Sequence, residues 1–237
     1  MIIRCLDVET TGLELPDAAV CEIGWCDILL HEDGRIEVLG PGSTLVKPPH
    51  SIPPAMSAIH HIVDGDVVDA PPLNDAIAIV QGGAPEVYAA HHATFERKFL
   101  TLSAPWICSY KVAITLAPSA PEYKLQTLRY WSKLDVDPAL ASPPHRAGPD
   151  AYVCACLLAR MLPKMPAEDM IRVSAAPVLL PRLHFGEHAG KPIEEVPWSY
   201  FNWIVHKSKG PWDEDVMHTA KHHLARLTAA QRSRSPV

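Results

Sequence analysis

The sequence predicts an α/β protein with a mixed β-sheet, and two features of the hydrophobic pattern indicate this class. Apolar runs of strand length joined by a hairpin turn occupy residues 1–48, so the sheet begins with antiparallel strands. Strands and amphipathic helices then alternate from residue 71 to residue 161, which is typical of a sheet covered by helices. The 237 residues are 48% hydrophobic, which is enough for one sizeable core and a small appendage.

The expected elements follow from these patterns along the chain. The first strand ends in a Thr-Thr-Gly turn, a second covers 18–30, and a His-Glu-Asp-Gly hairpin turn precedes a third at 35–48 that is broken near Pro41. A loop with short helices follows over 51–69. The later elements are a helix at 71–81, a strand at 86–91, a helix at 94–102, a strand at 106–110, and helices at 124–133 and 148–161.

The chain changes character after residue 162. A short helix leads into a proline-bearing connector, a stretch at 184–197 has the turn chemistry of a small hairpin, and two helical stretches follow at 198–205 and 213–227. The expected organisation is a first domain at 1–175, a connector at 176–182, a small C-terminal α+β module at 183–228 and a flexible tail at 229–237.

Charge and cysteine content narrow the class of protein. The net charge is −6, and it is uneven: residues 1–162 carry 11 basic and 19 acidic residues, whereas residues 163–237 carry 10 and 8. The six cysteines form no Cys-x-x-Cys pair and lie in apolar runs, which indicates reduced thiols in a cytoplasmic protein. A signal peptide and an apolar stretch of about 18 residues are both absent from the sequence, so we expect no membrane partner.

The most informative acidic residues are Asp7 and Glu9, which lie in the first strand. Side chains two residues apart in a strand point to the same face, so both carboxylates project together from the strand's end. Such oxygen ligands suit a hard divalent cation, Mg²⁺ or Mn²⁺. Three other acidic pairs share this spacing on expected turns or helix surfaces, but this pair lies in an apolar strand, where unpaired charge is costly.

Two later stretches supply further groups at the ends of expected elements. Glu96 follows the strand at 86–91, and a loop carries His145 five residues before Asp150 in the first turn of a helix. Two divalent ions about 3.5–4 Å apart could bracket a phosphodiester in such a site. His145 can titrate near neutral pH and could take a proton from an attacking water.

Three ordered motifs carry a resemblance to a known family. The segments LDVETTG at 6–12, AAHHATFERKFL at 89–100 and HRAGPDA at 145–151 resemble the DEDDh 3′–5′ exonucleases. The resemblance covers roughly residues 1–162 and implies an RNase H-like exonuclease domain whose mixed five-stranded sheet is flanked by helices. The segment at 185–205 resembles the small module that follows this domain in some members.

The resemblance also implies a role for individual residues. It makes Asp7, Glu9 and Asp150 direct ligands of two Mg²⁺ or Mn²⁺ ions, and it makes His145 the general base. Glu96 occupies the position of the family's third acidic ligand, which is normally aspartate, and His92 stands where relatives usually have asparagine. The positions that hold the terminal nucleotide in relatives are occupied here by Thr10, Thr11, Leu13, His60 and Phe95.

The implied activity is hydrolysis of phosphodiester bonds at nucleic-acid 3′ ends, with single-stranded DNA as the favoured substrate and 5′-mononucleotides as products. Two alternatives stay open: an exonuclease for RNA or short oligonucleotides, and an end-binding protein whose chemistry is impaired by Glu96. A homodimer also stays open.

Simpler roles remain for several residues: Asp150 could complement a helix N-terminus, and Glu96 could be an exposed first-turn glutamate. Phe95 could be a core residue, and Trp198, Tyr200 and Trp203 could stack on bases or form the core of the C-terminal module.

Overall fold

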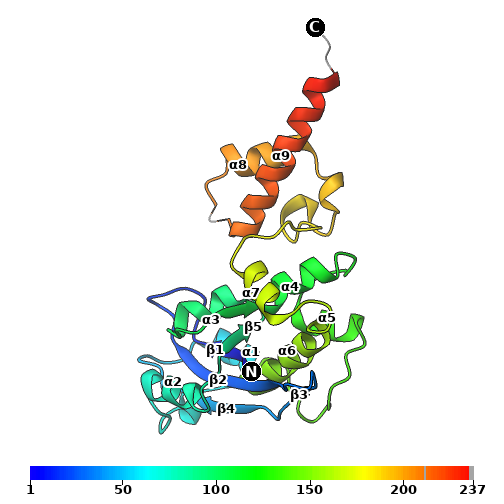
Figure 1. The fold of residues 1–237 in the computed structure, drawn as a ribbon. Coiled ribbons are helices and arrows are strands. Elements are labelled where there is room, and N and C mark those ends of the chain that lie inside the picture. The colour runs from blue at the N-terminus through cyan, green and yellow to red at the C-terminus, as the bar shows by residue number, and fades with distance from the viewer. Residues whose placement is uncertain (211, 235–237) are drawn as a thin grey trace.

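The computed structural model describes residues 1–210 and 212–234, and its first two thirds are built around a mixed β-sheet (Figure 1). β1 (Ile2–Thr10) lies in the middle, with β2 (Val20–Leu30) antiparallel on one side and β5 (Val87–Ala90) parallel on the other. β6 (Trp106–Cys108) extends the parallel side. This confirms the predicted α/β class with a mixed sheet.

The outer antiparallel position is shared by two short strands. β3 (Ile36–Val38) pairs with one half of β2, and β4 (Gly42–Leu45) pairs with the other half. The sheet therefore contains six strands in five positions. The break between β3 and β4 falls near Pro41, as predicted, because proline lacks the N–H that a strand ladder needs.

The helices that cover the sheet lie where the sequence predicts them, except at the end of β6. The predicted strand at 106–110 is two residues shorter, because a helix that the sequence reading missed, α4, begins at Ser109. The helices are α1 (Pro54–His60), α2 (Leu73–Gln81), α3 (Ala93–Phe99), α4 (Ser109–Leu116), α5 (Leu125–Trp131), α6 (Ala147–Met161), α7 (Ala167–Ser174), α8 (Trp198–His206) and α9 (Glu214–Arg234). Among residues 1–210 and 212–234, none of them combines the length and apolarity that crossing a membrane requires.

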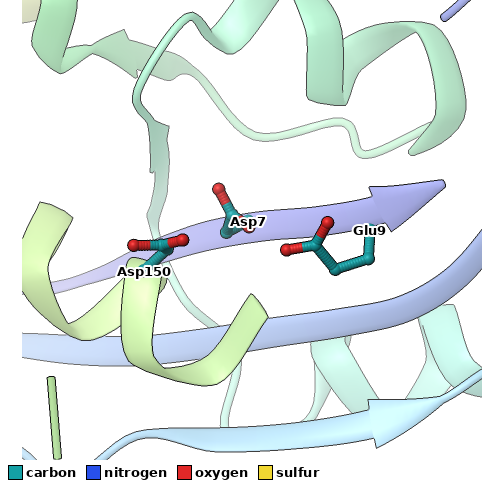
Figure 2. A group of neighbouring side chains, drawn as sticks. All are labelled: Asp7, Glu9 and Asp150. Atoms are coloured by element: carbon teal, nitrogen blue, oxygen red, sulfur yellow. The ribbon is translucent and has the colours of Figure 1, made fainter. Parts of the chain in front are cut away.

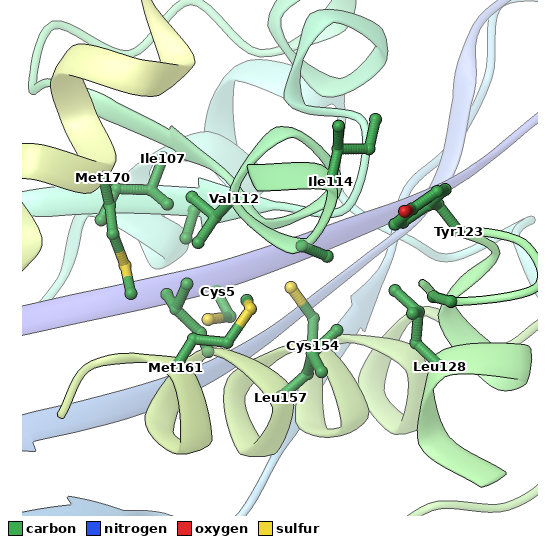
Figure 3. Close-up of a cluster of buried hydrophobic side chains, with 14 of the residues drawn as sticks. Cys5, Ile107, Val112, Ile114, Tyr123, Leu128, Cys154, Leu157, Met161 and Met170 are labelled. Atoms are coloured by element: carbon green, nitrogen blue, oxygen red, sulfur yellow. The ribbon is translucent and has the colours of Figure 1, made fainter. Parts of the chain in front are cut away.

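The main core lies between the sheet and α6. Cys5 of β1 faces Cys154, Leu157 and Met161 of α6, with Val112 of α4 beside them (Figure 3). The alternation of β1 puts Ile3 and Cys5 in this core, and its other face contributes to a second buried cluster. Asp7 and Glu9 continue the α6-facing row of β1. The six cysteines are all free and buried, as the sequence indicated.

The helix α6 touches the sheet most closely at Gly24 of β2. A Cβ atom at Gly24 would lie 2.0 Å from the carbonyl carbon of Ala147 and 2.3 Å from the backbone nitrogen of Gly148. Only glycine allows the first turn of α6 to lie directly on the strand. This contact fixes where α6 starts, and therefore where its first-turn side chains point.

The C-terminal segment joins the same core. Leu183, Ile193, Phe201 and Ile204 belong to the hydrophobic cluster that includes α6. On α4, Lys111 is 4% exposed. Its ammonium donates to the carbonyl oxygen of Ala176 at 2.9 Å and lies 2.5 Å from Glu214 and 3.5 Å from Asp215. A buried cation with three oxygen partners therefore ties α9 to the sheet domain.

The pairing predicted as a hairpin at 184–197 is short. The stretch forms two 3₁₀ turns, Gly186–His188 and Ile193–Glu195, and an antiparallel bridge joins Arg182 to Pro192. The backbone N–H groups of Leu183 and Ile193 donate to the carbonyl oxygens of Lys191 and Pro181 on either side of this bridge. Pro181 has no N–H to return a bond to Ile193, so the pairing does not lengthen into a strand in the described residues.

α9 continues through Arg234 on a sequence of good helix formers, and the predicted flexible tail at 229–237 stays a prediction. Residues 235–237 of that predicted tail lie outside the described residues. The domain boundary at 175–176, the connector at 176–182 and the module at 183–228 stay predictions.

The close approach at Gly24 gives the first testable prediction. We expect Gly24→Ala to lower the free energy of unfolding by roughly 1–3 kcal/mol, the usual cost of overpacking, because the new methyl group must displace the backbone of α6. Urea denaturation followed by circular dichroism measures this change. Gly40 is the control, because a Cβ there meets no atom within 4 Å. Equal stability of Gly24→Ala and Gly40→Ala would contradict the role given to this contact.

Candidate active site

Three carboxylates meet where β1 approaches the first turn of α6. Asp7 and Glu9 point from one face of β1, and Asp150 points toward them from α6 (Figure 2). One oxygen atom of each lies within 4.8 Å of the other two. The period-two alternation of β1 and the helix start predicted at 148–150 therefore bring these side chains together.

Asp150 is held in place by two hydrogen bonds. The backbone N–H of His145 donates to its Oδ2 atom at 2.8 Å, and the side-chain amide of Gln126 on α5 donates to Oδ1 at 2.7 Å. Asp150 thus binds backbone near the N-terminus of α6, which was the simpler role considered for it. Its oxygens nevertheless face Asp7 and Glu9, so the two roles coexist.

The sequence reading missed an ion pair beside the site, between Glu22 and Arg146. Glu22 is 1% exposed and is the β-ladder partner of Glu9. Its carboxylate accepts two hydrogen bonds from the guanidinium of Arg146, at 2.8 and 2.9 Å, and one from the backbone N–H of Ala147. These bonds outweigh burial and lower the pKa of Glu22. One signal was available: Glu22 is a lone charge in the apolar run Val20–Cys26.

The three clustered carboxylates repel one another in a poorly hydrated place. Burial is the main reason that the pKa of Asp7 rises well above its ordinary value, and Asp150, Glu9 and Glu96 add to it. Burial is also the main cause that raises the pKa of Glu9 to about 8, and the charge of Asp150 is the next. A divalent cation would relieve this repulsion, because it supplies two positive charges where hydrogen-bond donors are few.

Glu96 is the fourth acidic group and provides a test of whether the site fits metal ions. It lies in the first turn of α3 with only 3% of its surface exposed, so an exposed first-turn glutamate is the wrong description. In the part of the chain that the structure describes, its Oε2 atom has no hydrogen-bond partner. Burial raises its pKa well above the ordinary value. Glu96 is outside the group of carboxylates within 4.8 Å of one another, but its charge raises the pKa of Asp7, and an orphaned carboxylate oxygen is a natural ligand for a cation.

His145 lies at the edge of this cluster. His145 is exposed, and its backbone adopts a left-handed φ of 59°, so the loop turns sharply just before α6. His91, two residues before α3, is different. It bonds the hydroxyl of Ser109 and the carbonyl oxygen of Tyr123, and burial lowers its pKa to about 3. His145, by contrast, is exposed and its backbone N–H is bonded to Asp150.

The residues predicted to hold a nucleotide divide into two groups. Leu13 is 68% exposed, and Phe95 is half-buried with its ring against Phe99, so both keep apolar surface that a ligand could contact. Thr10 and Thr11 are buried, and their hydroxyls bond backbone atoms of the turn after β1.

His60 does not reach the surface. It is 2% exposed, and its Nδ1 atom accepts a hydrogen bond from the backbone N–H of Ile62. Its other ring nitrogen lies 3.8 Å from the sulfur of Cys21. In this conformation His60 packs beneath the site rather than lining it, and its contact with a nucleotide stays a prediction without geometric support.

The chain is similar to known proteins over most of its length. The model of the exonuclease family matches residues 5–158. Exodeoxyribonuclease 10 of Escherichia coli strain K12 is 32% identical over 231 residues, which cover 94% of this chain and 99% of that protein. The DNA polymerase III subunit epsilon of Treponema pallidum is 31% identical over 172 residues, or 66% of this chain and 74% of that protein. The solved structure of exonuclease X with 5′ overhanging duplex DNA has a TM-score of 0.61 and 32% identity, over 73% of this chain and 99% of that one.

The carboxylate cluster should make the stability of the metal-free protein depend on pH. Glu9 ionises at pH 4.5 when unfolded but at about 8 when folded, so the folded state binds more protons between these values. Protonation of Glu9 therefore contributes to the free energy of unfolding. This contribution is complete below pH 4.5 and is lost as the pH rises through about 8. We therefore expect Mn²⁺ to raise Tm by more at pH 8 than at pH 5, because cations replace protons on the ligands.

Thermal unfolding with chelator and with Mn²⁺, each across this pH range, measures the effect. In the metal-free protein Glu9→Gln should flatten the decline of Tm with pH, because the amide does not titrate. A Tm increase by Mn²⁺ that is the same at both pH values would contradict this account of the cluster.

Proposed function

The chain belongs to the exonuclease family, whose members are hydrolases of phosphodiester bonds; on this premise, we propose that it removes nucleotides one at a time from the 3′ ends of DNA. This agrees with the resemblance to DEDDh exonucleases that the three motifs predicted. The observation that carries the proposal is the cluster of Asp7, Glu9 and Asp150, with the orphaned carboxylate of Glu96 beside it.

The choice of DNA is supported by the relatives. Exodeoxyribonuclease 10 is named for action on DNA and matches this chain across nearly its whole length. Exonuclease X has been solved with duplex DNA carrying a 5′ overhang, in which the opposite strand ends in a recessed 3′ terminus. We infer that the substrate is a DNA 3′ end. Single-stranded DNA as the preferred form and a homodimer as the assembly stay predictions.

The family is generally dependent on divalent metal ions, and we propose that two Mg²⁺ or Mn²⁺ ions bind here. Asp7, Glu9 and Asp150 would hold them together with Glu96, and the charges of the other three acids all raise the pKa of Asp7. Bound divalent ions would activate the attacking water and offset the negative charge that develops on the phosphate. Hard cations with oxygen ligands fit this all-carboxylate donor set.

The protein's own groups would then orient the reaction. His145, on an exposed loop beside Asp150, would accept the proton from the attacking water. Gln126 and the backbone of His145 keep Asp150 facing the cluster, and the Glu22–Arg146 pair keeps the loop against β2. Leu13 and Phe95 would contact the terminal nucleotide, whereas Thr10 and Thr11 shape the turn on which Leu13 stands. The cytoplasmic location indicated by the cysteines stays a prediction.

A second candidate is an end-binding protein without turnover, because Glu96 replaces the aspartate usual in the family. The burial of Glu96 and its unpartnered oxygen favour a working ligand instead. An RNA or short-oligonucleotide exonuclease is the remaining alternative, and parallel assays on DNA and RNA strands of one sequence distinguish it.

Release of mononucleotides with Mn²⁺, lost on chelation, tests the proposal, and it is followed as the stepwise shortening of an oligonucleotide labelled at its 5′ end. Asp7→Asn should abolish release, because it removes a central ligand. His145→Ala should slow release on the order of a hundredfold, the usual contribution of general acid–base catalysis, and calorimetry should show that Mn²⁺ still binds.

The two substitutions control for each other. Asp7→Asn is expected to remove metal binding, whereas His145→Ala is expected to leave it intact. Wild-type rates from Asp7→Asn would refute the metal site. A wild-type rate from His145→Ala would remove this residue from the reaction. DNA binding without any release by the wild-type protein would favour the end-binding candidate.

Glu96 gives a separate prediction about metal choice. Its side chain is one methylene longer than aspartate, about 1.5 Å, so Mg²⁺ with its strict geometry should work less well than Mn²⁺. Glu96→Asp should raise the rate with Mg²⁺ relative to Mn²⁺, and Glu96→Ala should weaken binding of one of the two ions. Rates and calorimetric titrations with each metal measure both effects.

Asp75 supplies the matched control, because it is an acidic residue in the first turn of α2 with an exposed side chain. Asp75→Ala should leave rates and metal preference unchanged. If Glu96→Ala behaved like Asp75→Ala with both metals, Glu96 would have no role in metal binding.

A further inference from the structure

A cleft of about 590 Å³ lies between the sheet domain and the C-terminal segment. One wall carries His92, Tyr110 and Lys124, and the other carries Arg182, Leu183 and His184. His92 is the residue before α3, which carries Glu96, and Lys124 is the residue before α5, which carries Gln126. The two helices that present Glu96 and Gln126 to the site therefore begin at the cleft.

The cleft has an aromatic wall and a basic rim. The ring of His92 lies 3.8 Å from that of Tyr110 at an interplanar angle of 30°, and His92 is exposed. The guanidinium of Arg182 is held at the rim by the carbonyl oxygen of Gly190 at 3.0 Å. The side chain of Lys124 is 79% exposed and lies 3.4 Å from Glu122. Flat rings beside cations are the groups that bind bases and phosphates of a single strand.

An aromatic series continues from the cleft over the C-terminal module. Successive ring centroids lie 5.4 Å apart for His184 and Phe185, 4.7 Å for Phe185 and Trp212, 5.9 Å for Trp212 and Trp203, and 5.6 Å for Trp203 and Tyr200. Trp203 is 41% exposed, and a second hollow of about 340 Å³ lies beside it and Tyr200.

The exposed ring of this series, Trp203, is not part of the core of the module. Phe201, Ile204, Ile193 and Val196 are almost fully buried and form that core, and Phe185, Tyr200 and Trp212 are partly buried against it. Trp203 stands on the opposite side of α8 from the fully buried Phe201, and the exposed Lys207 lies just past the end of the helix. A large apolar ring left exposed next to a lysine indicates a binding surface.

We propose that the cleft and the aromatic series form a track that binds the single-stranded part of the substrate leading to the metal site. The track is defined by His92, His184, Phe185, Trp212, Trp203 and Tyr200. The inference rests on the proposed function and adds the course of the strand beyond its terminal nucleotide. A single strand fits the rings because its bases can separate and stack on side chains, whereas bases in a duplex stack on one another.

Fluorescence anisotropy with 5′-fluorescein oligothymidylates of 3 and 12 nucleotides tests the track. Chelator is present throughout, so that no cleavage occurs. The wild-type full chain should bind the 12-mer much more tightly than the 3-mer. Trp203→Ala should weaken 12-mer binding about tenfold, within the range measured for loss of one base–aromatic stack, and Trp203→Phe should restore most of the affinity. His184→Ala should weaken it in the same direction.

Matched controls come from exposed side chains away from the track. Trp131 on α5 is 43% exposed, and His218 on α9 is exposed, so Trp131→Ala and His218→Ala should bind the 12-mer as the wild type does. Thermal unfolding of each variant verifies folding. Wild-type affinity in Trp203→Ala, equal loss in Trp131→Ala, or equal binding of the 3-mer and 12-mer by the wild type would overturn the track. A blunt duplex bound as tightly as the single strand would overturn its single-stranded character.

A separate substrate distinguishes failure of this inference from failure of the proposed function. The p-nitrophenyl ester of thymidine 5′-monophosphate is too small to reach the module and reports only on the metal site. Hydrolysis of the ester with Mn²⁺ but no length-dependent binding would reject the track alone. Binding of the 12-mer that depends on Trp203, without ester hydrolysis, would support the track and reject the proposed activity.

Discussion

The contact between the first turn of α6 and β2 is the constraint on which the site depends. Gly24 lets the backbone of α6 rest on the strand, and Glu22 binds Arg146 and the N–H of Ala147 immediately before Asp150. These contacts join residues more than 120 positions apart in the sequence. They leave the position of Asp150 relative to β1 little freedom, and preorganisation of this kind is what a metal site requires.

The same geometry makes the cluster of carboxylates electrostatically unfavourable on its own. Asp7, Glu9, Asp150 and Glu96 share a region with little water, and Arg146, the cation bonded beside it, is engaged by Glu22. The surrounding core must offset this cost, and the tightly packed face of α6 against Cys5 and Val112 does so. The four acidic residues lower the stability of the fold, and the same four are the ones that the proposed chemistry needs. Functional sites commonly lower stability in this way.

The sequence predicts most of the fold and the acidic cluster, but not what supports it. Asp7 and Glu9 follow from the period-two alternation of a strand, and Asp150 follows from a helix start. Gln126 is an ordinary polar residue whose importance arises only from a tertiary contact 24 residues away. Glu22 stands out as a lone charge in an apolar run, but its partner Arg146 lies 124 residues away and could not be identified from the pattern. α4 was missed because Lys111 to Ile114 are all buried, so no amphipathic pattern marks the helix. The extent of the predicted hairpin could not be foreseen, because turn residues alone do not indicate how long a ladder forms beside them.

The buried ammonium of Lys111 has a consequence for folding during synthesis. Its partner Glu214 lies 103 residues later, so at about 5–20 residues per second α4 is complete roughly 5–20 s before α9 exists. During this interval Lys111 must stay hydrated, which holds the surface of α4 open to water. The nascent sheet domain therefore completes its packing only when α9 has emerged from the ribosome.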